Sequence, residues 1–297
     1  MAKKQFDNLQ GHFLELIRRT STIMPKDVVK AIETGRDSEK PGSPARSTMD
    51  AILEDIKLSG RTSIPLCQDT GTLIFNIDVP MSIIQKDLIH TIEKAIVEAT
   101  RKTFLRPNSV DPITGKNPGT NLGPGLPQLH FHQWDKDYIQ ARLMLKGGGS
   151  ENVSAQYKLP DTALKAGRDL KGVYNVVVDA VWKAQGKGCA PGIIGVGIGG
   201  DRPSGYECAK EQLLRPLHDV NKDPNLRKLE DDLFRDLNKL GIGPMGFGGN
   251  TTVLGVKAGY RMRLPACYFV SIAYICWSAR RKRMVLHPDG KVNYYDW

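Results

Sequence analysis

Three of the five cysteines lie where a thiolate could act as a metal ligand. Cys67 stands in the turn-forming segment 64–71, Cys189 in a loop with glycine and proline, and Cys276 at the end of an apolar run. Lys187 lies close enough to Cys189 to favour its thiolate. Thiolates from three distant segments can hold three irons of a cubane cluster and leave the fourth iron open to a substrate oxygen. Since no Cys-x-x-Cys pair is present, the spacing alone also fits three packed, inert thiols.

The other two cysteines and the start of the chain indicate the redox context. Cys208 lies in an amphipathic helical pattern and Cys267 in an apolar strand, so we expect packed thiols, although Cys267 could support a nearby site. An odd cysteine count without an export signal indicates reduced thiols rather than a disulfide framework.

The first seven residues have no apolar core behind them, and the apolar run 266–277 is far shorter than the roughly 20 residues of a spanning helix. We therefore expect a cytoplasmic protein without membrane segments.

The elements that must position these thiols alternate along the chain. Helical periodicity covers much of the first sixty residues, starting with Leu9, Phe13 and Leu16. Further helices are predicted at 83–104, 174–184, 205–217 and 226–240, and strands at 73–79, 129–134, 138–145, 193–198, 251–256 and 267–276, with a hairpin turn at 288–290. No internal repeat is present. The pattern predicts an α+β fold of mixed helices and mainly antiparallel strands, in one compact domain over residues 1–297 with a helical part at about 1–60.

Two irregular segments have the character of ligand-binding loops. Residues 105–128 form a long stretch crowded with proline, glycine and asparagine, and loops of that length inside a compact domain are usually functional. Lys146 is followed by three glycines and Ser150. Glycines allow the main chain to approach a ligand closely, although a plain turn would explain them equally well.

The net charge of +10 and the pI near 9.3 fit two kinds of partner. A positive field attracts anionic metabolites, and it also permits nucleic-acid binding. The one dense basic run, Arg280 to Arg283, is interpreted as a solvated surface, and no basic helix or aromatic-interleaved surface accompanies it. We therefore expect a small anionic substrate and no nucleic-acid partner.

A nucleotide-binding oxidoreductase is the main alternative from another enzyme class. The segment from Gly195 to Gly200 fits the pattern G-x-G-x-x-G and is followed by a predicted helix. Only Ile193 and Ile194 precede it as strand, and the glycines themselves belong to the strand pattern. This placement differs from the turn between strand and helix that holds a dinucleotide pyrophosphate.

Four short segments, in this order along the chain, together resemble the class I fumarase and L-tartrate dehydratase family. They are Cys67-Gln68-Asp69-Thr70-Gly71, Lys146-Gly147-Gly148-Gly149-Ser150, Gly241-Ile242-Gly243-Pro244-Met245-Gly246 and Cys276-Trp277-Ser278-Ala279-Arg280-Arg281. The set spans nearly the whole chain. The resemblance implies a hydro-lyase with a [4Fe–4S] cluster bound by the cysteines at the family's motif positions, which are Cys67, Cys189 and Cys276.

The same resemblance implies roles for four further residues. Gln68 and Asp69 would contact the substrate, with Asp69 a candidate proton carrier. Arg106 would grip a substrate carboxylate, a role that suits its planar guanidinium. Gly149, the last of the three glycines, would offer a main-chain contact. Taken singly, Asp69 also fits a turn-stabilising aspartate and Arg106 a surface charge.

The resemblance also implies a partner, because one-chain relatives continue into a second domain whereas this sequence ends at Trp297. It is similar to the α chain of the two-subunit form, so we expect a β subunit to supply the remaining catalytic residues, in an α2β2 assembly. Fumarate hydration to L-malate is the expected reaction, and dehydration of tartrate to oxaloacetate is the alternative. Where many relatives have two prolines after the middle cysteine, this chain has Ala190 and Pro191, a departure that leaves the cysteine itself intact.

Overall fold

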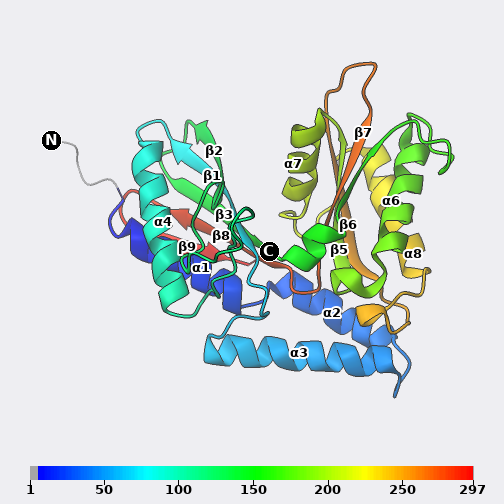
Figure 1. The fold of residues 1–297 in the computed structure, drawn as a ribbon, viewed down its shortest axis with the longest axis horizontal. Coiled ribbons are helices and arrows are strands. Elements are labelled where there is room, and N and C mark those ends of the chain that lie inside the picture. The colour runs from blue at the N-terminus through cyan, green and yellow to red at the C-terminus, as the bar shows by residue number, and fades with distance from the viewer. Residues whose placement is uncertain (1–5, 297) are drawn as a thin grey trace. The chain divides into compact units, whose positions relative to one another are not determined.

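The computed structural model describes residues 6–296, which form two compact units assembled from separate stretches of the chain (Figure 1). The first unit takes its described residues from Met1–Lys26, Asp55–Gly147 and Arg280–Trp297. The second unit comprises Asp27–Glu54 and Gly148–Ala279. The expected single domain over 1–297 stays a prediction.

Three helices occupy the N-terminal part, where the sequence predicts helix: α1 (Leu9–Thr22), α2 (Lys26–Ser38) and α3 (Pro44–Thr62). Helix α1 buries Phe13, Leu16 and Ile17, which share one face at helical spacing. Helix α1 belongs to the first unit, nearly all of α2 to the second, and α3 contributes residues to both.

The first unit is built on a five-stranded sheet in the order β2-β1-β3-β8-β9. Its strands are β1 (Thr72–Pro80), β2 (Gln128–Trp134), β3 (Ile139–Lys146), β8 (Arg280–Leu286) and β9 (Val292–Tyr295). Strands β1 and β2 are parallel, and the other neighbours are antiparallel. Apolar side chains of α1 and of α4 (Gln85–Arg101) pack with alternate residues of β1, β3 and β8 into one core. These two helices therefore cover one face of the sheet.

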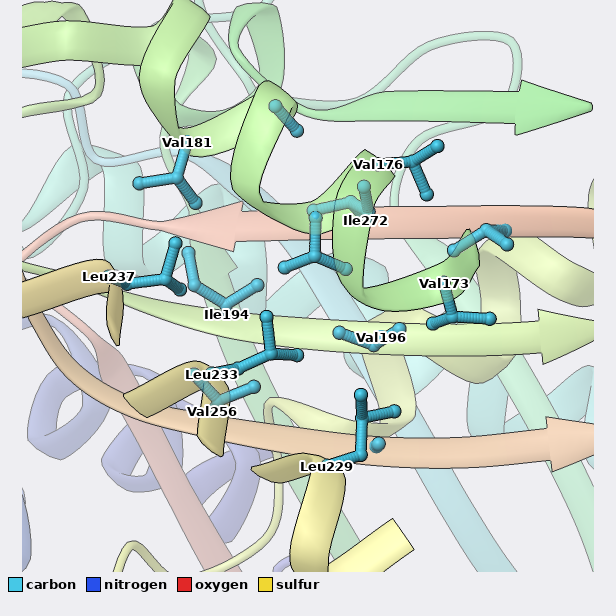
Figure 2. Packing of buried hydrophobic residues seen from close by; sticks show 14 of the residues in the cluster. Val173, Val176, Val181, Ile194, Val196, Leu229, Leu233, Leu237, Val256 and Ile272 are labelled. Atoms are coloured by element: carbon cyan, nitrogen blue, oxygen red, sulfur yellow. The ribbon is translucent and has the colours of Figure 1, made fainter. Parts of the chain in front are cut away.

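The second unit is built on a four-stranded sheet in the order β4-β7-β5-β6. Its strands are β4 (Ala155–Lys158), β5 (Gly192–Gly199), β6 (Val253–Arg261) and β7 (Phe269–Ile275), of which only the β5 and β6 pair is parallel among the described pairings. Helices α6 (Leu170–Ala184) and α8 (Pro224–Asn238) pack on one face. Figure 2 shows Val173 of α6 near Val196 of β5, Val176 of α6 near Ile272 of β7, and Leu233 of α8 near Val256 of β6, all within one apolar cluster.

Helix α7 (Arg202–Gln212) packs on the opposite side of β5, against its glycines. A Cβ added to Gly195 would lie 2.1 Å from the carbonyl oxygen of Ala209, and one added to Gly197 would lie 2.2 Å from that of Gly205. The glycines that suggested a nucleotide-binding loop therefore let a helix approach the strand, and all of β5 is buried. This packing accounts for the G-x-G-x-x-G pattern without a bound phosphate.

The α+β prediction with mainly antiparallel strands is confirmed, since five of the seven described strand pairings are antiparallel. The predicted helices and strands all occur, with ends shifted by a few residues. Two short elements, α5 (Gly148–Asn152) and β4, were not predicted, because segments of 5 and 4 residues carry little periodicity. Between residues 6 and 296, no helix has the length and apolar character needed to cross a membrane.

Candidate functional site

The loop of Cys67 joins α3 to β1 and is anchored by its main chain. The buried Leu66 donates its N–H to the carbonyl oxygen of Ser21 at 3.0 Å, and the hydroxyl of Ser59 donates to the carbonyl of Ile64 at 2.5 Å. After this anchor, Cys67 and Asp69 are half-buried and Gln68 is exposed. The fold therefore fixes the backbone of this loop and leaves its polar side chains accessible.

Asp69 is held from three directions within the first unit. Its Oδ1 accepts a hydrogen bond from the N–H of Gly71 at 3.1 Å, and its carbonyl oxygen accepts one from Nη2 of Arg280 at 2.7 Å. Its Oδ2 abuts Gly147, where an added Cβ would lie only 2.9 Å away. Gly71 has a φ of 80° and packs on the main chain of Lys146, which also requires glycine. Two of the other three sequence motifs, 146–150 and 276–281, thus supply residues that contact the turn of Asp69.

The loop of Arg106 is tied to the same turn. The hydroxyl of Thr70 donates to the carbonyl of Arg106 at 3.3 Å, and Nδ2 of Asn121 donates to that carbonyl at 2.9 Å. Nδ2 of Asn108 donates to the hydroxyl oxygen of Thr70 at 3.2 Å. The side chain of Arg106 is exposed. The first unit therefore brings together the segments of Gln68, Asp69 and Arg106.

The anchoring residues Asn108 and Asn121 were not identified from the sequence. The abundance of asparagine in the long loop was visible, but nothing local indicated which residues would bond to Thr70 or to the carbonyl of Arg106. These contacts join positions 38 and 15 residues apart. Such pairings depend on the fold rather than on spacing.

The basic run Arg280 to Arg283 was predicted to lie on a solvated surface, and this is wrong for its first three residues. The side chains of Arg280 and Arg281 are fully buried, and Lys282 is 3% exposed. They lie on β8, which is an inner strand between β3 and β9. The physical reason is that these charges have internal partners: Arg280 bonds to the carbonyl of Asp69, and Lys282 is ion-paired with Asp296. A cation buried without a carboxylate costs several kcal/mol, on the order of 3–5, so such a position needs a specific explanation.

In the second unit, Cys189 and Cys276 lie close together. The carbonyl oxygen of Cys189 accepts a hydrogen bond at 3.2 Å from the N–H of Trp277, which directly follows Cys276. Cys189 is exposed, with a φ of 53°, and Cys276 is 8% exposed at the end of β7. Burial raises the pKa of the Tyr274 phenol well above its ordinary value, and the charges of Cys276 and Cys189 raise it further. Both thiols therefore lie within electrostatic reach of one buried phenol.

The loop of Cys189 rests on the third motif, 241–246. The N–H of Met245 donates to the carbonyl of Ala190 at 2.9 Å. A Cβ on Gly186 would lie 2.5 Å from the carbonyl oxygen of Met245, so the two loops touch through their main chains. Gly149 is exposed in α5, and a Cβ added to it would lie 3.9 Å from the carbonyl oxygen of Lys187. The second unit thus brings together Cys189, Cys276 and Gly149.

Glu39 is a further supporting residue that the sequence did not reveal. Its carboxylate is 3% exposed and accepts hydrogen bonds from the N–H groups of Asn250 at 2.9 Å and Thr251 at 2.8 Å. These residues follow the 241–246 motif and fix the end of its loop. Glu39 lies in a charged, glycine- and proline-rich stretch, where a structural carboxylate has no local signature.

Thiol ligands suit an iron–sulfur cluster, and two of the three predicted ligands meet in one unit. Cys67 belongs to the first unit, whereas Cys189 and Cys276 belong to the second. Among residues 6–296, no three or more His, Cys, Asp or Glu side chains form a group that could hold a metal ion. Binding of one cluster by all three thiols therefore stays a prediction.

Comparison with known proteins gives a consistent assignment. The sequence profile of the family described as fumarate hydratase (Fumerase) matches residues 11–285. The chain is 50% identical over 286 residues to a putative fumarate hydratase class I of Geobacillus stearothermophilus, covering 95% of this chain and 56% of that protein. It thus spans little more than half the length of that relative.

Two further relatives match over most of their own length. The chain is 34% identical to a putative L(+)-tartrate dehydratase subunit alpha of Methanocaldococcus jannaschii, covering 94% of this chain and 98% of the relative. It is 29% identical to the L(+)-tartrate dehydratase subunit alpha of Escherichia coli K12, covering 91% and 88%. Class I fumarate hydratases are generally iron–sulfur dependent. The chain belongs to the fumarate hydratase (Fumerase) family.

Proposed function

We propose that the chain is the α subunit of an iron–sulfur hydro-lyase that catalyses the reversible hydration of fumarate to L-malate. The observation that carries the proposal is the 50% identity to a putative class I fumarate hydratase over 95% of this chain. L-tartrate dehydration to oxaloacetate is the second candidate, supported by the two relatives named as tartrate dehydratase alpha subunits. The two reactions have the same chemistry, because both add or remove water next to a carboxylate.

The proposed cofactor is a [4Fe–4S] cluster bound by Cys67, Cys189 and Cys276. Support comes from the family, from the accessible thiol of Cys67 on an anchored loop, and from the proximity of Cys189 and Cys276. When bound, a cluster with one iron free of protein ligands supplies a Lewis acid for the hydroxyl group that is added or lost.

The proposed substrate-binding residues have distinct tasks. Arg106 is exposed on an anchored loop and offers a planar fork of N–H groups to one carboxylate. Gln68 contacts the substrate, and Gly149 presents its main chain at the start of α5. Asp69 contacts the substrate and carries a proton at its carboxylate, which the contacts with Gly71 and Gly147 hold in place.

A β subunit is the proposed partner. The alpha subunits of tartrate dehydratase are covered over 98% and 88% of their length, whereas the putative class I fumarate hydratase is covered over 56%. The naming of these two relatives as alpha subunits supports a partner chain, for which we propose an α2β2 assembly and a cytoplasmic location. The net charge of +10 suits a dicarboxylate substrate, since a positive field raises the encounter rate with anions.

The proposal is tested by anaerobic co-expression with a candidate β chain, followed by assays on fumarate and L-tartrate side by side. Turnover of fumarate with the brown absorbance of an iron–sulfur cluster is the expected result. A clear preference for tartrate would move the assignment to the second candidate. Full activity in iron-free protein would contradict the cofactor and the mechanism together.

A further inference from the structure

Arg280 is a fully buried cation whose described hydrogen bond goes to the main chain of Asp69. Its side chain has 0% exposure, and its Nη2 lies 2.7 Å from the carbonyl oxygen of Asp69. Within residues 6–296, its Nε and Nη1 have no hydrogen-bond partner, and no carboxylate lies within ion-pair distance of it. The side chain is thus buried with most of its N–H groups lacking a hydrogen-bond acceptor.

Stability does not explain an arginine at this position. A buried charge without a carboxylate partner is unfavourable, and an apolar side chain of similar volume is often neutral or stabilising at such sites. Lys282 provides the contrast on the same strand. It lies two residues further along β8, on the same face, and is ion-paired with Asp296. Of these two buried cations, Arg280 is the one directed at the Asp69 turn.

The contacts of Asp69 show what Arg280 contributes. Oδ1 of Asp69 is bound by the N–H of Gly71, a local contact within the turn, and Oδ2 abuts Gly147. The hydrogen bond from Arg280 joins the turn to β8, 211 residues away in sequence. Without it, the peptide group between Asp69 and Thr70 can rotate, and the carboxylate moves with the main chain. Arg280 is thus a long-range restraint on the orientation of this carboxylate.

We propose that Arg280 is a positioning residue for the reaction, which fixes the carboxylate of Asp69 against Gly147 by holding the Asp69 carbonyl. In this proposal Arg280 does not touch the substrate. It acts on the reaction only through Asp69. The inference rests on the proposed function, in which Asp69 carries a proton. It adds a residue from the end of the chain to the catalytic apparatus around the Cys67 loop.

A double-mutant cycle in the cluster-loaded complex with the β subunit tests this role. Arg280→Met is expected to lower kcat for the preferred dicarboxylate by about 10- to 100-fold with little change in KM, because misplacing a catalytic group has costs of this order. Adding Arg280→Met to Asp69→Asn is expected to lower kcat no further, since both changes remove the same function. Fully additive losses would show that Arg280 does not act through Asp69 and would overturn the proposal.

Hydrogen exchange in the full-length chain without cluster gives a readout that is independent of activity. Arg280→Met is expected to raise the exchange rates of the amides in 68–71 at least about tenfold, because the hydrogen bond that limits local opening is lost. Lys282→Met is the matched control: it should lower the melting temperature by leaving Asp296 unpaired, yet leave exchange in 68–71 unchanged. Wild-type exchange rates in Arg280→Met would overturn the proposal.

Arg280→Lys extends the test if Arg280→Met does not fold. It keeps the charge but replaces the guanidinium fork, so kcat should fall below the wild-type value and the amides in 68–71 should exchange faster than in the wild type. Wild-type values in both measurements would overturn the proposal. If the wild-type complex acts on neither fumarate nor tartrate, the proposed function fails, whereas the exchange experiment still decides whether Arg280 holds the Asp69 turn.

Discussion

At the residue scale, the absence of a side chain at Gly147 determines where the carboxylate of Asp69 can lie. We predict that Gly147→Ala lowers kcat at least about tenfold, because an added Cβ would lie 2.9 Å from Oδ2 of Asp69 and displace it. The φ of Gly147 is not in the left-handed region, so the cost in stability should stay below about 1 kcal/mol. Steady-state kinetics and thermal unfolding would separate the two effects.

The matched control for this prediction is Gly60→Ala. Gly60 lies in α3 with nothing within 4 Å of an added Cβ. The substitution should stabilise the chain by about 0.5–1 kcal/mol through helix propensity and leave kcat unchanged. A normal kcat in Gly147→Ala would show that the position of the Asp69 carboxylate is not important for the reaction.

The cysteines permit an equally local prediction. Cys189→Ser and Cys276→Ser should each abolish the brown absorbance and reduce hydration to background, because both remove a thiolate ligand. Cys208→Ala should retain both, since Cys208 is fully buried in α7 and its burial raises the pKa of the thiol, which keeps it protonated. Iron and sulfide analysis with absorbance spectra would check this. Loss of the cluster in Cys208→Ala alone would contradict the ligand assignment.

At the element scale, the contact of β5 with α7 depends on glycine. We predict that Gly197→Ala destabilises the second unit by about 3 kcal/mol, because the new Cβ would lie 2.2 Å from the carbonyl oxygen of Gly205 and the helix must move. Urea unfolding monitored by circular dichroism would measure this loss. Saturable binding of NAD(P) to the wild type would instead favour a nucleotide site at these glycines.

Most elements were predictable because their signals are local. The apolar spacing of α1 and the alternation in β1 and β3 indicated which residues would form the core of the first unit. The site was predictable only in part. The resemblance predicts roles for Cys67, Asp69 and Arg106, and the structure links the loops of these residues through the hydrogen bond from Thr70 to Arg106.

The remaining parts of the site depend on contacts between distant segments. The 280–283 run was expected on the surface because four consecutive charges are usually solvated, and only the pairing of β8 between β3 and β9 places them inside. Glu39 similarly acquires its role from Thr251, 212 residues away. Neither contact leaves a periodic or compositional signal in the sequence.

At the scale of the whole molecule, each unit has an apolar core of its own. One core joins α6 and α8 to the four-stranded sheet, and the other joins α1 and α4 to the five-stranded sheet. Neither core includes Cys67, Cys189 or Cys276. Folding energy therefore comes mainly from apolar burial, in contrast to small metal-dependent domains that unfold without their metal.

Removal of the cluster should therefore abolish activity without unfolding the chain. We predict that oxidation followed by chelation of iron removes the brown absorbance and the hydration of fumarate, while the far-UV circular dichroism of the chain changes little. Because the thiols remain in place, anaerobic addition of iron, sulfide and a reductant should restore activity. The control is Cys276→Ser taken through the same treatment. Because this variant lacks one of the proposed thiolate ligands, it should show no activity after the addition of iron and sulfide. Loss of the helical signal on iron removal would show that the cluster, rather than the two cores, maintains the fold.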